Sequence, residues 1–176
     1  MTAASIVGAA NVLTFDANSE IVADAQRNFH RNGLGEIKLR WGVLKNRQLI
    51  HEENETVDFY ITKDFWGSRL RISENSQEIL KKVRVPVFCL EDEIKVHRGN
   101  VLICDIEGGE VDLLTQSDLT GVTKIIIETH LWAVGERETD EMMRKLISNG
   151  FSIDLNLSDV MTLGGKRPEA ASSAVP

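Results

Sequence analysis

The chain has 176 residues, of which 42% are hydrophobic and 27% charged, and its formal net charge is -7. This length fits one domain with a single core, and no apolar run approaches the ~20 residues of a membrane-spanning helix. The acidic balance disfavours nucleic acid as a partner, because surfaces that bind phosphates carry clustered basic residues. The first residues lack the basic region of a secretory signal. We therefore expect a cytoplasmic protein with a small-molecule substrate and no membrane partner.

The first predicted elements are a strand, a helix and a second strand. Residues 11–18 (NVLTFDAN) form a short apolar run that ends in Asp, and residues 36–44 (EIKLRWGVL) predict the next strand. Between them lies a helical pattern that Ser19 can cap and Gly33 can stop. Its predicted apolar face consists of Ile21, Val22, Ala25 and Phe29. The length of about 35 residues is that of a βαβ unit.

The middle of the chain is less regular. Residues 55–75 alternate apolar and polar side chains, which predicts a hairpin or an arm beside the main sheet. The segment 85–94 (VPVFCLEDEI) then predicts a short strand that enters an acidic turn. Cys89 and Cys104 lie in apolar strand-like runs, where reduced thiols act as small hydrophobes, so we predict no disulfide.

The second half repeats the order of strand and helix. Residues 100–106 (NVLICDI) predict a buried parallel strand, residues 108–118 a helix, and residues 122–130 (VTKIIIETH) another strand. The helix predicted over residues 136–148 should turn four apolar side chains inward: Met142, Met143, Leu146 and Ile147. Residues 151–157 and 159–165 predict closing strands. We expect one domain over residues 1–163 and a disordered tail over residues 164–176.

Polar residues follow three of the predicted strands. They form the pairs Asp16 with Asn18, Asp105 with Glu107, and Glu128 with His130. Parallel strands of an open α/β sheet bring their carboxyl ends to one edge, where such sheets bind ligands. The sequence therefore predicts a ligand site at this edge.

Four segments carry a family resemblance: VLTFDANSEIVADAQRNFHRNGL, VPVFCLEDEI, VLICDIEGGEVDLL and KIIIETH. In this order and spacing they resemble the FkbM-type S-adenosylmethionine-dependent methyltransferases. The resemblance implies a class I, Rossmann-like α/β fold, with a mostly parallel sheet and helices on both faces. It also implies that S-adenosyl-L-methionine is the cofactor and that a methyl group passes to the hydroxyl oxygen of a small molecule or sugar.

The resemblance assigns the cofactor to residues near the first two strands. Asp16, with Asn18 beside it, resembles the acidic position that accepts hydrogen bonds from the ribose hydroxyls, and a carboxylate suits a diol. Trp41 and Gly42 resemble the place where the adenine ring lies. The alternatives are that Asp16 caps the following helix and that Trp41 is a packing residue.

The resemblance assigns catalysis to Asp105, Glu107 and His130. A carboxylate after the strand could stabilise the sulfonium, orient a hydroxyl or take its proton, and His130 could act as a general base. The alternatives are that Glu107 and Glu110 favour a helix N-terminus and that His130 is structural. A divalent ion held by Asp105, Glu107 and His130 is conceivable from ligand type, but the prediction is no metal.

The sequence departs from the family at its start. Class I methyltransferases have a first strand and a Gly-rich loop for the methionine end of the donor, and residues 2–10 (TAASIVGAA) resemble the helix after that loop. We expect an N-terminally truncated sheet, with weak donor binding and with exposed strand edges that favour a homo-oligomer. The alternative function is a non-catalytic remnant or interaction module that keeps the fold without the cofactor.

Overall fold

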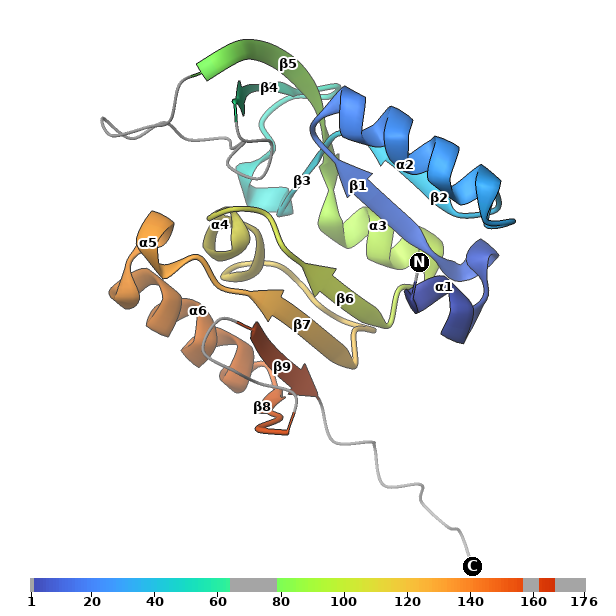
Figure 1. Ribbon diagram of the computed structural model, residues 1–176. Helices are drawn as coiled ribbons and strands as arrows, with labels where there is room; N and C mark the ends of the chain where they lie inside the picture. The colour runs from blue at the N-terminus through green and yellow to red at the C-terminus, as the bar shows by residue number, and fades with distance from the viewer. Residues whose placement is uncertain (1, 64–78, 157–161, 167–176) are drawn as a thin grey trace, which may run out of the picture. The chain divides into compact units, whose positions relative to one another are not determined.

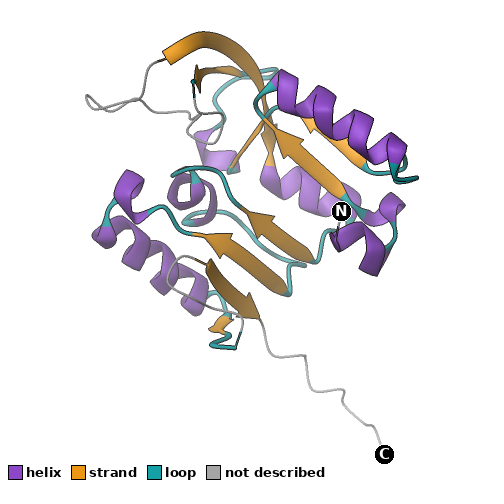
Figure 2. Ribbon diagram, in the orientation of Figure 1, coloured by secondary structure: helices purple, strands orange, loops and turns teal. Residues whose placement is uncertain are grey.

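A computed structural model describes residues 2–63, 79–156 and 162–166 of the chain, which form a mixed α/β structure (Figures 1 and 2). Contacts within the chain define two compact units, Met1–His97 and Arg98–Pro176, here called the N-terminal and C-terminal units. The single domain expected over residues 1–163 stays a prediction. The described residues include no helix that is long and apolar enough to cross a membrane.

The N-terminal unit begins with α1 (Thr2–Val7) and the short 3-10 helix η1 (Ala9–Asn11). Strand β1 (Leu13–Asp16) then pairs in parallel with β2 (Lys38–Trp41), from Leu13 opposite Lys38 to Asp16 opposite Trp41. The connection between them is α2 (Ser19–Arg31). The predicted order of strand, helix and strand is therefore confirmed.

Helix α2 has the predicted apolar face but a different cap. The four half-buried apolar side chains are Ile21, Val22, Ala25 and Phe29, and none is fully buried. The helix begins at Ser19, and the Asn18 side chain accepts a hydrogen bond from the Glu20 backbone N–H. The prediction of Ser19 as the cap is wrong by one residue, because Asn18 fills the same role equally well.

A second sheet of this unit has the order β3-β5-β4. Strand β3 (Val43–Lys45) is parallel to β5 (Ile79–Cys89), and β4 (Thr56–Thr62) is antiparallel to β5. Strand β4 lies within the segment 55–75 for which a hairpin or an arm was predicted, but its partner β5 lies beyond that segment. Residues 64–75 lie outside the described residues, so a hairpin within the segment stays a prediction. Val43, Phe59 and Val85 form the core, and α3 (Leu90–His97) follows β5.

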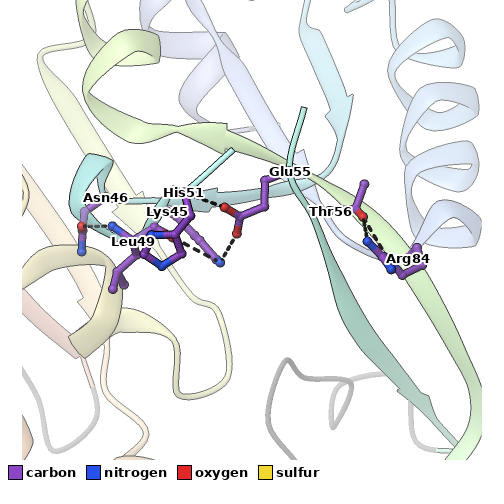
Figure 3. A network of polar contacts seen from close by, with 7 residues as sticks. All are labelled: Lys45, Asn46, Leu49, His51, Glu55, Thr56 and Arg84. Atoms are coloured by element: carbon purple, nitrogen blue, oxygen red, sulfur yellow. Dashed lines mark hydrogen bonds and ion pairs between the residues drawn. The ribbon is translucent and has the colours of Figure 1, made fainter. Parts of the chain in front are cut away.

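A polar network secures the loop between β3 and β4, which includes the 3-10 helix η2 (Arg47–Leu49) (Figure 3). Lys45 Nζ lies 2.6 Å from Glu55 Oε1, and the His51 backbone N–H donates to Glu55 Oε2 at 2.8 Å. The Asn46 side chain accepts from the backbone of Gln48 and Leu49. The hydrogen bond from Lys45 holds the pKa of Glu55 below its usual value. These contacts link the two ends of the loop and satisfy several of its polar groups.

The C-terminal unit has one sheet with the order β6-β7-β9-β8. Its elements are β6 (Val101–Cys104), α4 (Glu110–Leu114), β7 (Lys124–Glu128), α5 (Leu131–Val134), α6 (Glu136–Ser148), β8 (Ser152–Ile153) and β9 (Thr162–Lys166). Strands β6 and β7 are parallel, whereas β9 is antiparallel to both β7 and β8. Helix α6 buries Thr139, Met142 and Leu146. Ile147 is 51% exposed, so the predicted inward face is wrong there.

The predicted single, mostly parallel sheet is not confirmed. The described residues form three small sheets, and two of them contain antiparallel pairs. Antiparallel pairing arises where a strand returns beside its neighbour without a crossover, as β4 and β5 do. The predicted tail also starts later than residue 164, because residues 164–166 belong to β9 and residues 167–176 lie outside the described residues. Both cysteines are free thiols.

Candidate functional site

In the N-terminal unit, Asp16 ends β1 beside Trp41 at the end of β2. Its Oδ1 accepts a hydrogen bond of 2.7 Å from the Asn18 backbone N–H. Burial raises the pKa of the Asp16 carboxyl above its usual value, and the bond from Asn18 partly opposes this. Oδ2 has no hydrogen bond among the described residues. One oxygen of this half-buried carboxylate is therefore available to a ligand.

The neighbours of Asp16 take part in local contacts. Asn18, which is 5% exposed, uses its Oδ1 to cap α2. The Trp41 indole N–H donates to the Ala17 carbonyl at 2.8 Å, and 39% of Trp41 is exposed. These bonds fix the turn between β1 and α2. They give Asn18 a structural role and leave part of the Trp41 ring accessible.

Gly42 separates β2 from β3 and packs under an aromatic ring. A Cβ atom at this position would collide with the Phe88 ring and would lie 2.9 Å from the Pro86 carbonyl oxygen. The Phe88 ring is itself tilted against Phe15, with their centroids 5.5 Å apart. Close packing therefore accounts for a glycine here. The role of Gly42 at an adenine ring stays a prediction.

In the C-terminal unit, the polar residues that follow β6 and β7 gather around His130. The His130 side chain is 3% exposed, and its Nδ1 lies 2.6 Å from Glu110 Oε1. Glu110 is 1% exposed, and the same oxygen accepts from the backbone N–H groups of Gly108 at 3.2 Å and Ile106 at 3.4 Å. A buried carboxylate with three donors is an acceptor, so the hydrogen of neutral His130 belongs on Nδ1.

The other ring nitrogen of His130 faces two more carboxylates. Nε2 lies 3.5 Å from Glu107 Oε2 and 3.8 Å from Asp105 Oδ1. Both distances exceed the about 2.7–2.9 Å of a charge-assisted hydrogen bond. Among the described residues, Nε2 therefore has charged neighbours but no hydrogen bond. We call Asp105, Glu107, Glu110, Glu128 and His130 the His130 cluster.

The turn after β6 has a constrained backbone. Glu107 has a φ of 52°, in the left-handed region that non-glycine residues rarely adopt, and Gly108 follows with a φ of 95°. A Cβ on Gly108 would lie 2.7 Å from the Ala133 Cβ, so this turn packs closely against α5. Burial raises the pKa of Glu107, His130 lowers it, and the surrounding carboxylates raise it further. The packed turn thus holds Glu107 beside groups of its own charge.

Comparison with known families gives a match along most of the chain. The model of the "Methyltransferase FkbM domain" matches residues 3–153. This chain belongs to the FkbM methyltransferase family. The resemblance seen in the sequence is confirmed, and the chain is a methyltransferase-family protein. Neither the curated proteins nor the solved structures give a match.

All seven predicted site residues of this FkbM domain lie within the matched range. The structure brings Asp16, Asn18, Trp41 and Gly42 together at the end of the first sheet, and the three predicted catalytic residues meet around His130. The proximity within each group is observed, and the assigned roles stay predictions.

Sequence reasoning assigned no catalytic or binding role to Glu110 or Glu128, although it placed Glu128 at the ligand edge of the predicted sheet. Glu110 lies in the first turn of a helix, where a glutamate normally faces solvent and favours the helix dipole. The signal that could have identified it is its position three residues after Glu107 and just before the apolar residues of a short helix. Glu128 ends β7 two residues before His130, and strand alternation predicts that both side chains lie on the same side.

Proposed function

We propose that this FkbM-family chain transfers a methyl group from S-adenosyl-L-methionine to a hydroxyl oxygen of a small molecule or sugar. The observation that carries the proposal is the His130 cluster, in which Glu110 orients a buried imidazole with its second nitrogen toward two carboxylates. The donor supplies an electrophilic methyl group on a sulfonium centre. The protein must bind, orient and deprotonate the acceptor, and the residues of the chain can do each of these.

The residues around Asp16 fit the donor that the family implies. Asp16 keeps one carboxylate oxygen without a hydrogen bond, which suits a ribose hydroxyl. Trp41 keeps 39% of its surface exposed beside Asp16, which suits a stacking contact with a planar base. Asn18 holds the turn through its cap to α2. These residues are the ones that we assign to the cofactor.

His130 can act on the acceptor because Glu110 fixes its protonation pattern. With Nδ1–H committed to Glu110, the lone pair of neutral His130 is on Nε2. A lone pair there can take the proton of a hydroxyl group, and Asp105 and Glu107 can orient that hydroxyl by accepting hydrogen bonds. Asp105 is the most accessible of the three, since its side chain is 60% exposed.

The charge of the cluster favours an uncharged acceptor. Asp105, Glu107 and Glu128 are carboxylates on one side of His130, and Glu110 is a fourth behind it. Like charges at short range raise the free energy of binding an anion by several kcal/mol. An acceptor with neutral hydroxyl groups avoids this cost and can donate hydrogen bonds to the carboxylates. A sugar or a hydroxylated small molecule meets both requirements.

A second candidate is a non-catalytic chain that keeps the fold without the cofactor. The observation in its favour is that two residues assigned to the cofactor make internal hydrogen bonds: Asn18 Oδ1 caps α2, and the Trp41 indole N–H donates to the Ala17 carbonyl. The packing of Gly42 under Phe88 also needs no ligand. This candidate predicts a folded protein that does not bind S-adenosylmethionine.

Two measurements separate the candidates. The first is a titration of the purified chain with S-adenosylmethionine, followed by the NMR signal of the Trp41 indole. Asp16→Ala should weaken binding about tenfold or more, because a charge-assisted hydrogen bond contributes about 1.5–3 kcal/mol, whereas Glu36→Ala on the exposed surface should not. The second is the release of S-adenosylhomocysteine with a panel of hydroxylated acceptors. Because weak donor binding is expected of this chain, the non-catalytic candidate is supported only if donor binding and release of S-adenosylhomocysteine are both absent.

A further inference from the structure

The His130 cluster has a charge arrangement that the methyl-transfer proposal does not explain. In the tautomer that donates Nδ1–H to Glu110, His130 Nε2 carries a lone pair, which repels the carboxylate oxygens that lie 3.5 Å away on Glu107 and 3.8 Å away on Asp105. His130 is 3% exposed, so solvent screens this repulsion poorly. A cation between the lone pair and the carboxylates would turn each repulsion into an attraction.

The ligand atoms lie close to the spacing that one metal ion requires. One oxygen each of Asp105 and Glu128 and one nitrogen of His130 all lie within 4.8 Å of one another. Bonds of about 2.1 Å place neighbouring ligands about 3.0 Å apart and opposite ligands about 4.2 Å apart. The 3.8 Å from Nε2 to Asp105 Oδ1 falls between these values. Small side-chain movements would therefore complete the coordination.

The surroundings of His130 supply the support that a metal-bound histidine needs. Histidine ligands usually donate their second N–H to a carboxylate, which fixes the tautomer and the ring plane. Glu110 does this for Nδ1 at 2.6 Å, and two backbone N–H groups hold its oxygen in place. The other oxygen, Oε2, is buried with no hydrogen-bond partner among the described residues. Burial of such a charge is costly unless positive charge lies nearby.

We propose that Asp105, Glu128 and His130 bind one divalent transition-metal ion, with Glu110 as the positioning residue for His130. Imidazole nitrogen together with two carboxylates suits Mn²⁺, Fe²⁺ or Zn²⁺, whereas Mg²⁺ and Ca²⁺ prefer oxygen ligands alone. The ligand set includes Glu128 from the end of β7 in place of Glu107, the residue that the sequence considered. Glu107 stays a neighbour of Nε2 that is free to contact an acceptor.

The chemical use of this ion rests on the proposed function, but its binding does not. Nε2 cannot hold an ion and accept a proton at the same time. With the ion bound, a hydroxyl group of the acceptor binds to the metal and its pKa falls. Its proton then passes to a neighbouring carboxylate, and Glu107 is the one that the ligand set leaves unused.

The test is a titration of the full chain with Mn²⁺ alone, followed by the loss of the electron paramagnetic resonance signal of free Mn²⁺. We expect one ion per chain and competition by Zn²⁺ but not by excess Ca²⁺. Asp105→Asn and Glu128→Gln should each weaken binding at least tenfold, and Glu110→Gln about tenfold through the orientation of His130. Asp105 is 60% exposed, so its replacement should leave the fold intact.

Two matched variants keep the result specific. Glu141→Gln removes an exposed carboxylate of the same unit, and Glu107→Gln removes the neighbour outside the ligand set. Glu141→Gln should bind Mn²⁺ as the unchanged chain does, and Glu107→Gln should weaken binding less than Asp105→Asn does, because it removes a nearby negative charge but no ligand. The proposal is overturned if the chain binds no stoichiometric Mn²⁺ at millimolar concentration, or if Asp105→Asn and Glu128→Gln bind as tightly as Glu141→Gln. The Mn²⁺ titration contains neither methyl donor nor acceptor, so its result does not depend on whether the chain transfers methyl groups.

Discussion

The polar residues at the strand ends have different hydrogen-bond partners in the two units. In the N-terminal unit, Asp16 and Asn18 accept hydrogen bonds from nearby backbone N–H groups, so these side chains shape a turn. In the C-terminal unit, Glu110 accepts from a side chain twenty residues away, and His130 faces carboxylates that offer it no hydrogen bond. A turn that satisfies its own backbone needs no ligand. Carboxylates that gather around the buried side chains of His130 and Glu110 are stabilised by one, which makes the His130 cluster the stronger candidate for chemistry.

Among the substitutions that test this comparison, Glu110→Ala should have the largest effect on stability. It leaves the buried His130 N–H and two backbone N–H groups without an acceptor, so the free energy of unfolding should fall by about 3 kcal/mol. Chemical denaturation of the full chain measures this. The control is Glu141→Ala on the exposed side of α6, which should change stability by less than about 0.5 kcal/mol. Equal effects of the two changes would show that the hydrogen bonds of Glu110 contribute nothing to stability.

His130→Asn separates the two nitrogens of the imidazole. The asparagine amide can still donate to Glu110 from the position of Nδ1, but nothing replaces Nε2. In an active preparation, turnover should fall about a hundredfold while the melting temperature stays within a few degrees, whether Nε2 accepts a proton or holds an ion. His30→Asn on the exposed side of α2 serves as the control. Full activity of His130→Asn would remove His130 from the mechanism.

Gly42→Ala tests the packing explanation in the N-terminal unit. The added methyl group collides with the Phe88 ring and the Pro86 carbonyl, so we expect a loss of about 1–3 kcal/mol in stability. Gly35→Ala, where no atom lies within 4 Å of the new Cβ, should be nearly neutral. Adding Phe88→Leu to Gly42→Ala should restore part of the loss. If Gly42→Ala folds normally but loses only donor binding, the adenine role would be favoured.

Asp16→Asn should give the smallest change in stability, and its sign depends on pH. Because burial raises the pKa of Asp16 in the folded chain, the carboxyl stabilises the fold at pH below its ordinary value of about 3.9. This contribution is lost as the pH rises through the folded pKa. Asp16→Asn should therefore be slightly more stable than the unchanged chain at pH 7, by less than about 1 kcal/mol, with no gain near pH 3. Thermal unfolding at both pH values measures it, and a loss of stability at pH 7 would contradict the assignment.

The elements that sequence predicted well are those whose pattern is local. The apolar face of α2 follows from the spacing of Ile21, Val22, Ala25 and Phe29, and these residues are the half-buried ones. Strand ends at Asp16 and Glu128 follow from apolar runs that stop at a carboxylate. The basic first half of β5, including Lys81 and Lys82, was not predicted as strand, because its extended form depends on pairing with β4.

Three residues of the His130 cluster were predicted from the sequence, but the buried Glu110 that contacts His130 was not. Asp105, Glu107 and His130 were accessible to sequence reasoning because each follows a predicted strand. The burial of Glu110 was not, since only the approach of His130 from another strand explains why a glutamate is 1% exposed. The grouping of Glu128 with Asp105 and His130 joins the ends of two neighbouring strands, which no local pattern indicates. Contacts between residues far apart in the sequence therefore set the limit of the prediction.

The break at Gly42 has a consequence for how the N-terminal unit opens. On either side of this residue the same extended stretch contributes β2 to the sheet with β1 and β3 to the sheet with β5. Releasing either sheet frees one end of the stretch and loosens the register of the other. Amide hydrogens of Leu39 and Leu44, which lie in different sheets, should then exchange with solvent deuterium in a single cooperative step.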